Sequence, residues 1–137
     1  MVRCGLDDEK LIKILAELDP YAIRSIDISY NPLITSTGYL ALSNYILDPC
    51  CSLTDLNVEG NCMKDRNFQI LTVALQEYKC IEVLNISKND LTDHYAEDFG
   101  KMIEINKQLR VLFAHYNRFM GKGGSFIAKA IQSSLNL

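Results

Sequence analysis

The stretch Ile81-Glu-Val-Leu-Asn-Ile-Ser-Lys-Asn-Asp-Leu91 decides the fold of this chain, because its pattern returns along the sequence. An apolar residue stands at places one, four, six and eleven, and an asparagine stands at place nine. Three further segments, beginning at Ile23, Leu53 and Leu109, fit the same frame, and only Ala114 is undersized for its place. The four asparagines are separated by 30, 28 and 28 residues. The chain is therefore predicted to consist of stacked units of about 28 residues.

Incomplete copies of the pattern are expected at both ends of the chain. Cys4 takes the place of the asparagine and Leu6 that of the last leucine, 27 residues before their counterparts in the first full copy, Asn31 and Leu33. Leu137 follows Leu109 by 28 residues, where the next copy would open. This alignment predicts a single domain over residues 1–137, with a partial repeat at 1–20 and full repeats from about 22, 52, 80 and 108.

Each copy begins with the periodicity of a strand. Places four and six alternate inward, as the buried residues of a strand do. The asparagine at place nine has a short amide side chain that can bond backbone groups where the chain leaves the strand. Stacked copies should therefore form a ladder of such side chains, consisting of Asn31, Asn61, Asn89 and Asn117.

The second part of each copy has the periodicity of a helix, with apolar residues at i, i+3, i+6 and i+7. The predicted buried faces are Phe68, Leu71, Ala74 and Leu75, then Ala96, Phe99, Met102 and Ile103, then Gly124, Ile127, Ala130 and Ile131. The first full copy fits as Tyr39, Leu42, Tyr45 and Ile46 after a shift of one residue. This shift predicts one extra residue before the helix and one near Pro49-Cys50-Cys51. The expected N-caps are Asp7, Ser36, Asp65 and Thr92.

A strand, a turn and a full α-helix within about 28 residues make the chain similar to leucine-rich repeats of the ribonuclease-inhibitor-like subtype. This resemblance implies an α/β solenoid with a short parallel sheet on its concave face and helices on its convex face. The family includes ribonuclease inhibitors, Ran GTPase-activating proteins, sensor domains of immune receptors, tropomodulin C-terminal domains and axonemal proteins. Because these proteins share the scaffold and differ in their surfaces, the resemblance predicts the fold and not the function.

Composition and charge exclude several classes of protein. The 137 residues are 48% hydrophobic with a net charge of −3, and the 14 basic residues form no run, which disfavours nucleic acid as a partner. No stretch approaches 18 apolar residues and the first ten residues contain no apolar core of a secretion signal, so no membrane segment is expected. Five cysteines, an odd number without a C-x-x-C pair, predict free thiols and a reduced, cytoplasmic location. The resemblance to tropomodulin domains and axonemal proteins extends this expectation to the cytoskeleton.

Three segments contain residues of chemical interest, and none predicts an enzyme, a cofactor or a metal site. Gly121-Lys-Gly-Gly-Ser125 suggests a phosphate loop, but the glycine that such a loop needs five residues earlier is Tyr116, so a strand-to-helix corner is favoured. Cys50-Cys51 has no second cysteine pair to complete a metal site, so packing is favoured. His115 has no serine, cysteine or carboxylate that the sequence places beside it for catalysis, so a binding role is favoured.

The concave face can be read from places three, five and seven of each copy, with place eight at its rim. The first half is acidic, and the second half is apolar and aromatic. Because exposed aromatic and apolar groups are typical of interfaces, this face is the predicted binding site. The alternative is that another segment of the polypeptide or assembly covers Phe113. The candidate binding residues are Asp27, Asp55, Asn57, Glu59, Asn85, Val111, Phe113, His115 and Tyr116.

The predicted function is therefore protein–protein interaction or scaffolding through the concave face. One alternative is a GTPase-activating or regulatory role of the Ran GTPase-activating type, which the resemblance allows and for which Arg24 and Arg110 are the arginines to examine. Another is an internal structural segment of a larger axonemal or cytoskeletal assembly. Since a repeat buries its apolar edge only against a neighbour, both ends are expected to pack on further repeats, another subunit or a second copy of the chain.

Overall fold

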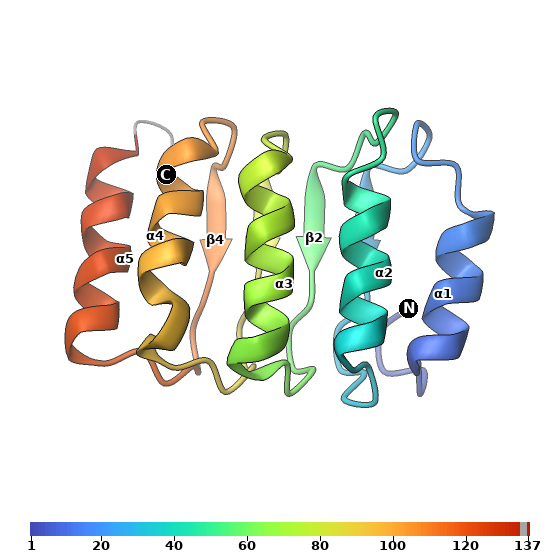
Figure 1. Ribbon diagram of the computed structural model, residues 1–137, viewed down its shortest axis with the longest axis horizontal. Helices are drawn as coiled ribbons and strands as arrows, with labels where there is room; N and C mark the ends of the chain where they lie inside the picture. Colours follow the sequence, from blue (N-terminus) through green and yellow to red (C-terminus); the bar gives the residue numbers. More distant parts are fainter. Residues whose placement is uncertain (135–136) are drawn as a thin grey trace.

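A strand and a helix alternate along the chain in the computed structural model, which describes residues 1–134 and 137 (Figure 1). Positions 135 and 136, which precede the predicted start of a further copy at Leu137, lie outside the described residues. The elements are α1 (Asp8–Glu17), β1 (Ser25–Asp27), α2 (Ser36–Ile46), β2 (Asp55–Asn57), α3 (Lys64–Glu77), β3 (Val83–Asn85), the 3-10 helix η1 (Asp93–Tyr95), α4 (Ala96–Ile105), β4 (Val111–Phe113) and α5 (Gly121–Ser133).

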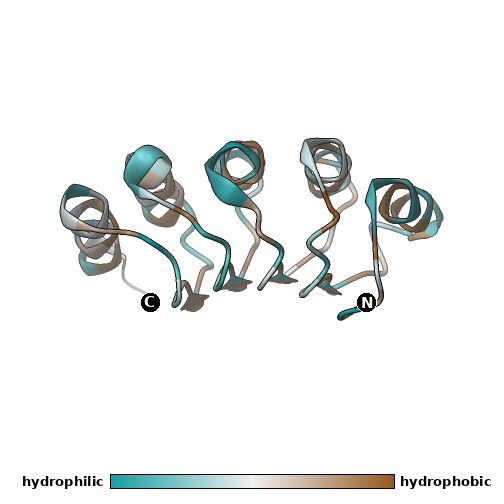
Figure 2. Ribbon diagram, turned by 90° about the horizontal axis from the view of Figure 1, so that it is seen from below, coloured by the Kyte–Doolittle hydropathy of each residue, from teal (hydrophilic) through white to brown (hydrophobic). Residues whose placement is uncertain are grey.

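The strands form one parallel sheet in the order β1-β2-β3-β4, and Figure 2 shows them along the inner side of an arc whose outer side is lined by the helices. This arrangement confirms the predicted α/β solenoid, with the sheet on the concave face and the helices on the convex face. None of the helices in the described part of the chain is long and apolar enough to cross a membrane.

The register of the sheet is the register of the repeats. Place four pairs across every strand, because Ile26 lies beside Leu56, which lies beside Leu84 and then Leu112. Ile26, Leu56 and Leu84 are no more than 2% exposed, and they face the helices. A slip of one residue would turn this row to the concave face, so the core fixes which side chains the opposite face presents.

The predicted apolar faces of α2, α3 and α4 are confirmed, since all of their members are buried. Phe68 of α3 and Phe99 of α4 contact each other with ring centroids 4.9 Å apart, which joins neighbouring repeats. In α5 the prediction is confirmed for Ala130 but not for Ile131, which is 37% exposed. Among the described residues, α5 packs on α4 and η1 and stands last in the row of helices (Figure 1).

The asparagines at place nine bond adjacent repeats together. The side-chain oxygen of Asn89 accepts hydrogen bonds from the backbone N–H of Asn61 at 3.0 Å and of Met63 at 3.2 Å. The side-chain nitrogen of Asn89 donates to the carbonyl oxygens of Val58 at 2.9 Å and Ile86 at 3.1 Å. One buried side chain therefore satisfies backbone groups of two repeats, none of which has an α-helical or sheet partner at this bend.

The same pattern extends in both directions along the solenoid. Asn117 accepts from the N–H groups of Asn89 and Leu91, and Asn31 accepts from those of Cys4 and Leu6. Cys4 therefore stands where an asparagine would, although it contributes its backbone and not an amide.

One framework residue was assigned wrongly from the sequence. Leu33 is 60% exposed, whereas its neighbour Ile34 is 3% exposed and fills the place that Met63 and Leu91 fill in later repeats. The cause is the extra residue before α2, which shifts the buried position by one. Thr35 rather than Ser36 consequently caps α2, by accepting a hydrogen bond from Thr37.

A second set of side chains joins the helix starts of successive repeats. The carboxylate of Asp8 accepts from the N–H groups of Thr35 at 2.7 Å and Gly38 at 3.1 Å, one repeat later. The predicted caps Asp7 and Thr92 are confirmed. The predicted cap Asp65 is wrong, because it lies inside α3 and its carboxylate accepts from the N–H of Thr92, 2.8 Å away.

Asp93 provides the last of these contacts and explains the glycine-rich segment. Its carboxylate accepts from the N–H of Met120 at 2.7 Å, at the start of α5. A Cβ atom on Gly123 would collide with this carboxylate, whereas one on Gly124 would meet nothing within 4 Å. Gly121 has a φ of +43°, which favours glycine. The carboxylate of Asp93 thus stands at the start of α5, where a phosphate loop would hold its phosphate, and the segment is a strand-to-helix corner.

We expect alanine substitutions at these adjacent glycines to have opposite effects. Gly124→Ala should stabilise the protein by up to about 1 kcal/mol, because alanine favours the helix. Gly123→Ala should cost about 1–2 kcal/mol relative to Gly124→Ala, because Asp93 must leave Met120. Urea unfolding of the two variants measures the difference, and equal midpoints would show that the contact of Asp93 does not stabilise the fold.

Candidate protein-interaction surface

The sheet places the predicted binding residues in two rows on the concave face. Cross-strand pairing brings Asp27, Asn57, Asn85 and Phe113 into one row, and Ser25, Asp55, Val83 and Val111 into the other. Between the rows lies a shallow hollow of about 190 Å³, lined by Ser25, Asp27, Asp55, Leu56, Asn57, Val83, Asn85 and Phe113. The concave face therefore offers a continuous surface that runs from carboxylates on β1 and β2 to apolar groups on β3 and β4.

The carboxylates of Asp27 and Asp55 are bonded to neutral groups. Asp27 accepts from the N–H and hydroxyl of Ser29 at 2.9 and 2.7 Å, and from the side-chain nitrogen of Asn57 at 3.0 Å. Asp55 accepts from the hydroxyl of Thr54 at 2.6 Å. No lysine or arginine forms an ion pair with either carboxylate within residues 1–134. The negative charge at this end of the face is thus uncompensated.

The side chain at place five accepts a hydrogen bond from the backbone two residues later and so fixes the conformation at the end of its strand. The side-chain oxygen of Asn57 accepts from the N–H of Glu59 at 3.0 Å, and that of Asn85 accepts from the N–H of Ser87 at 3.0 Å. Asp27 makes the corresponding bond to Ser29. These half-buried side chains are held before any partner arrives, which lowers the entropy cost of binding.

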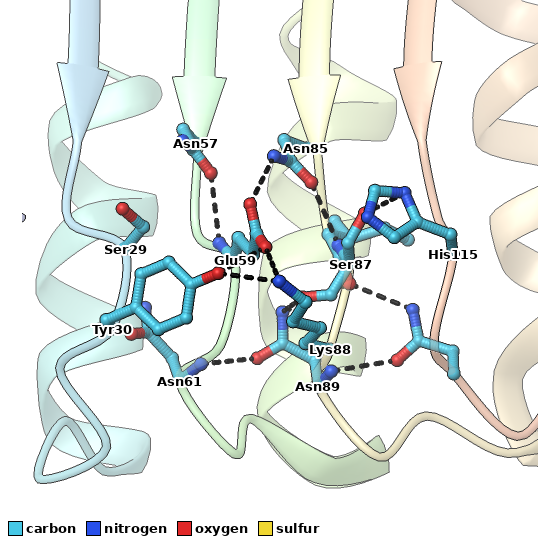
Figure 3. A network of polar contacts seen from close by, with 12 residues as sticks. Ser29, Tyr30, Asn57, Glu59, Asn61, Asn85, Ser87, Lys88, Asn89 and His115 are labelled. Atoms are coloured by element: carbon cyan, nitrogen blue, oxygen red, sulfur yellow. Dashed lines mark hydrogen bonds and ion pairs between the residues drawn. The ribbon is translucent and has the colours of Figure 1, made fainter.

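Glu59 differs from the two aspartates because it belongs to an internal network (Figure 3). One carboxylate oxygen lies 2.6 Å from the Lys88 ammonium and accepts from the hydroxyl of Tyr30 at 2.6 Å. The other oxygen accepts from the side-chain nitrogen of Asn85 at 3.1 Å. The hydrogen bonds from Lys88 and Tyr30 lower the pKa of Glu59 to about 2. The negative charge of Glu59 is therefore already balanced by the Lys88 ammonium within the protein.

Place eight forms a rim along the concave face, defined by Arg3, Tyr30, Gly60, Lys88 and Tyr116, all with positive φ. Arg3 and Lys88 lie over the ring of Tyr30, with 5.1 and 5.3 Å between charge and ring centroid, and Lys88 also lies 5.8 Å from the ring of Tyr116. A Cβ atom on Gly60 would come within 2.7 Å of the Tyr30 ring. The glycine thus lets Tyr30 reach Lys88 across an intervening repeat.

The sequence places Tyr30 and Lys88 at the rim, at place eight, but does not single them out as binding residues, and Arg3 was not identified. Their shared place in the repeat was the available signal, because equal places in stacked copies lie side by side.

The opposite end of the face is apolar and aromatic. Phe113 is 44% exposed, Val111 is 38% exposed and Tyr116 is 77% exposed. His115 is also exposed, and its ring packs edge-on against Phe113 and Tyr116. The Nδ1 atom of His115 lies 3.0 Å from the hydroxyl of Ser87.

The expectation that place seven projects from the face fails for Ser29 and Ser87, which are 2% and 0% exposed. Their small side chains are enclosed where the strands end. The hydroxyl of Ser87 beside His115 is consequently not an accessible nucleophile.

Other chemical candidates are occupied or isolated. Arg24 donates to the carbonyl oxygen of Ser52 at 3.3 Å, and Arg110 lies 3.9 Å from the Glu82 carboxylate. All five cysteines are unpaired. In the described part of the chain, no three His, Cys, Asp or Glu side chains come together as a metal site would require.

The convex face carries an apolar groove of about 320 Å³ between α2 and α3 that the sequence analysis did not identify. Leu40, Leu47 and Val73 line it and are 53%, 45% and 55% exposed. α2 contains no charged residue. Leu40 and Leu47 are seven residues apart on one helix side, which was the available signal.

The network around Glu59 predicts a pH dependence of stability. Because the pKa of Glu59 is lowered in the folded state, its contribution is present above about pH 4.5 and is lost as the pH falls toward 2. We expect wild type to exceed Glu59→Gln in unfolding free energy by about 1 kcal/mol at pH 6, a modest value because Lys88 is partly exposed. Urea unfolding of both proteins at pH 6 and pH 2.5 tests this prediction. The difference in unfolding free energy between wild type and Glu59→Gln should shrink at pH 2.5, and an equal difference at both pH values would contradict it.

The comparisons with known proteins agree with this architecture. A family model described as "Leucine Rich repeat" matches residues 50–66. "Capping protein, Arp2/3 and myosin-I linker protein 3" of Homo sapiens, and likewise that of Mus musculus, is 31% identical over 96 residues, which is 70% of this chain. The chain spans only 7% of the length of these curated relatives.

Among solved structures, the tropomodulin C-terminal domain of Caenorhabditis elegans superimposes with a TM-score of 0.76. The match covers 96% of this chain and 80% of that domain at 17% identity, so it shows the fold. The repeated motif, the solenoid and these matches together show that the chain is a leucine-rich-repeat protein.

Proposed function

We propose that the chain is a protein-interaction or scaffolding module that binds a partner protein through the concave face of its sheet. The observation that carries this proposal is the exposure of Phe113, Val111 and Tyr116 together on a preorganised surface. Aromatic groups on a rigid surface are typical centres of protein interfaces, and a contiguous exposed apolar patch usually marks an interaction site. The residues that we propose to contact the partner also include the candidates Asp27, Asp55, Asn57, Asn85 and His115. Glu59 contributes indirectly, because it holds Tyr30 and Lys88 in place at the rim.

The relatives favour a cytoskeletal setting for this role. The 31% identical proteins are named as linkers of capping protein, Arp2/3 and myosin-I, and the structural neighbour is part of tropomodulin. A cytoplasmic or cytoskeletal scaffold is therefore the setting that we propose, with residues 1–137 as one domain of ribonuclease-inhibitor-like repeats. The partners named for the relatives are not transferred, because the chain covers 7% of their length.

A GTPase-activating role is less well supported than binding. Such a role needs an arginine or another polar group that is free to reach a bound nucleotide. Arg24 and Arg110 both contact an adjacent repeat, through the carbonyl oxygen of Ser52 and the carboxylate of Glu82, and Ser87 beside His115 is fully buried. We therefore propose a non-enzymatic module and assign no catalytic residue.

A structural role within a larger assembly is a second candidate, and it uses a different surface. Ile131 on α5 is 37% exposed, whereas the exposed part of Phe126 lines a hollow toward α4. We propose that a further repeat or another subunit covers this flank of α5, because a repeat buries its apolar edge against a neighbour. Such packing leaves the concave face free, so the two roles are compatible.

The proposed function predicts that one substitution on the concave face abolishes partner capture. Phe113→Asp should reduce the yield of its partner in affinity purification from a cell extract by at least tenfold, because it places a charge in the centre of the interface. Val73→Asp is the matched control, since Val73 is equally apolar and 55% exposed on the convex side.

The reverse result would contradict the proposal. Loss of the partner with Val73→Asp and retention with Phe113→Asp would place the interface in the groove between α2 and α3. Circular dichroism of both variants verifies that each is folded.

A further inference from the structure

We infer that the partner presents an amphipathic helix to the concave face, with an apolar side chain over Phe113 and lysine or arginine side chains over Asp55 and Asp27. This inference rests on the proposed function and adds the chemistry of the partner to it. The distribution of charge, the pairing of the sheet and the spacing of its strands support it.

The charge of the face selects a cationic partner. Asp27 and Asp55 accept hydrogen bonds from neutral donors alone, whereas Glu59 already has Lys88 at 2.6 Å. A positive side chain would find two uncompensated carboxylates in the same hollow. A negative or neutral one would lose its own hydration there without a charged partner, so the face discriminates by charge.

The sheet selects a helix over an extended segment. β2 and β3 have neighbours on both sides, so their backbone groups are already paired. An extended peptide laid on this face would therefore leave its own backbone groups without ladder partners. A helix satisfies its backbone internally and can still present a row of side chains. The arc in Figure 2 leaves the concave side open along the direction of stacking.

The strand spacing fixes where the charges of this helix must lie. Neighbouring strands are about 4.8 Å apart, so along the stacking direction β2 lies about 10 Å and β1 about 14 Å from β4. Phe113 and Asp27 stand in one row, and Asp55 stands in the other row, about 7 Å further along its strand. A helix rises about 1.5 Å per residue, so positions i+7 and i+11 lie about 10 and 16 Å from position i on the same side. The matching sequence is an apolar residue followed by basic residues seven and eleven places later, in either chain direction.

Synthetic helical peptides test this inference on the full chain. The matched peptide carries a leucine at i and arginines at i+7 and i+11 in an alanine–glutamine host. One control moves the arginines to i+5 and i+9, on the opposite side of the helix, and the other replaces them by glutamate. Fluorescence anisotropy should show that the matched peptide binds at least tenfold more tightly than either control. Equal affinity of the matched and displaced peptides would overturn the inference.

Protein variants locate the peptide on the face. D27N/D55N, which keeps a side-chain oxygen as acceptor at each position, should lower the affinity for the matched peptide by about tenfold. E17Q/E77Q removes the same charge from the convex helices and should leave its affinity unchanged. D27K/D55K should reverse the preference and bind the glutamate peptide. Equal losses with D27N/D55N and E17Q/E77Q would show that net charge alone attracts the peptide and would overturn the inference.

The outcomes separate this inference from the proposed function. If Phe113→Asp abolishes partner capture but no peptide discriminates, the face binds a partner of another shape, and only the helix inference fails. If Phe113→Asp leaves capture unchanged, the proposed function fails as well. A dimer in light scattering that Phe113→Asp dissociates would place a second copy on the face and would also overturn the inference.

Discussion

The hydrogen bonds of the asparagine ladder are the constraint on which the rest of the structure depends. At the end of each strand the chain turns into a loop whose backbone groups are buried, and these groups have no regular secondary-structure partner. Asn89 satisfies groups of its own repeat and of the preceding one, with no exposed surface. Because each asparagine bonds to the repeat before it, the ladder sets the displacement between successive repeats. It also keeps residues at the same place of each repeat side by side.

The concave surface follows from this alignment. The strands are only three residues long, so sheet hydrogen bonds alone give each pair little stability. The ladder below the strands and the carboxylates of Asp8, Asp65 and Asp93 at the helix starts hold neighbouring repeats at separate points. The result is a rigid face whose side chains stand in rows. A partner can then bind without ordering the sheet, which suits a scaffold better than a flexible surface would.

The fold was predictable because its determinants are local and repeated. Places four and six and the asparagine are visible within eleven residues, and their period reveals the stacking. The concave rows followed from strand alternation. Contacts between repeats were less accessible, since Lys88 meets Tyr30 over a separation of 58 residues and Asp93 excludes a Cβ at Gly123. Leu33 was misassigned because a one-residue insertion changes the buried place without changing the composition. The convex groove was missed because single exposed leucines are ordinary on helices.

The most direct test of this account is the free energy of unfolding of Asn89→Leu compared with that of Asn44→Leu. Leucine at position 89 removes the amide and leaves the backbone groups of Asn61, Met63 and Val58 without partners. Asn44 is exposed on α2, so the same change there removes no buried hydrogen bond. We predict that Asn89→Leu lowers the free energy of unfolding by about 1–3 kcal/mol, while Asn44→Leu stays within about 0.5 kcal/mol of wild type. Equal stabilities of the two variants would contradict the central role of the ladder.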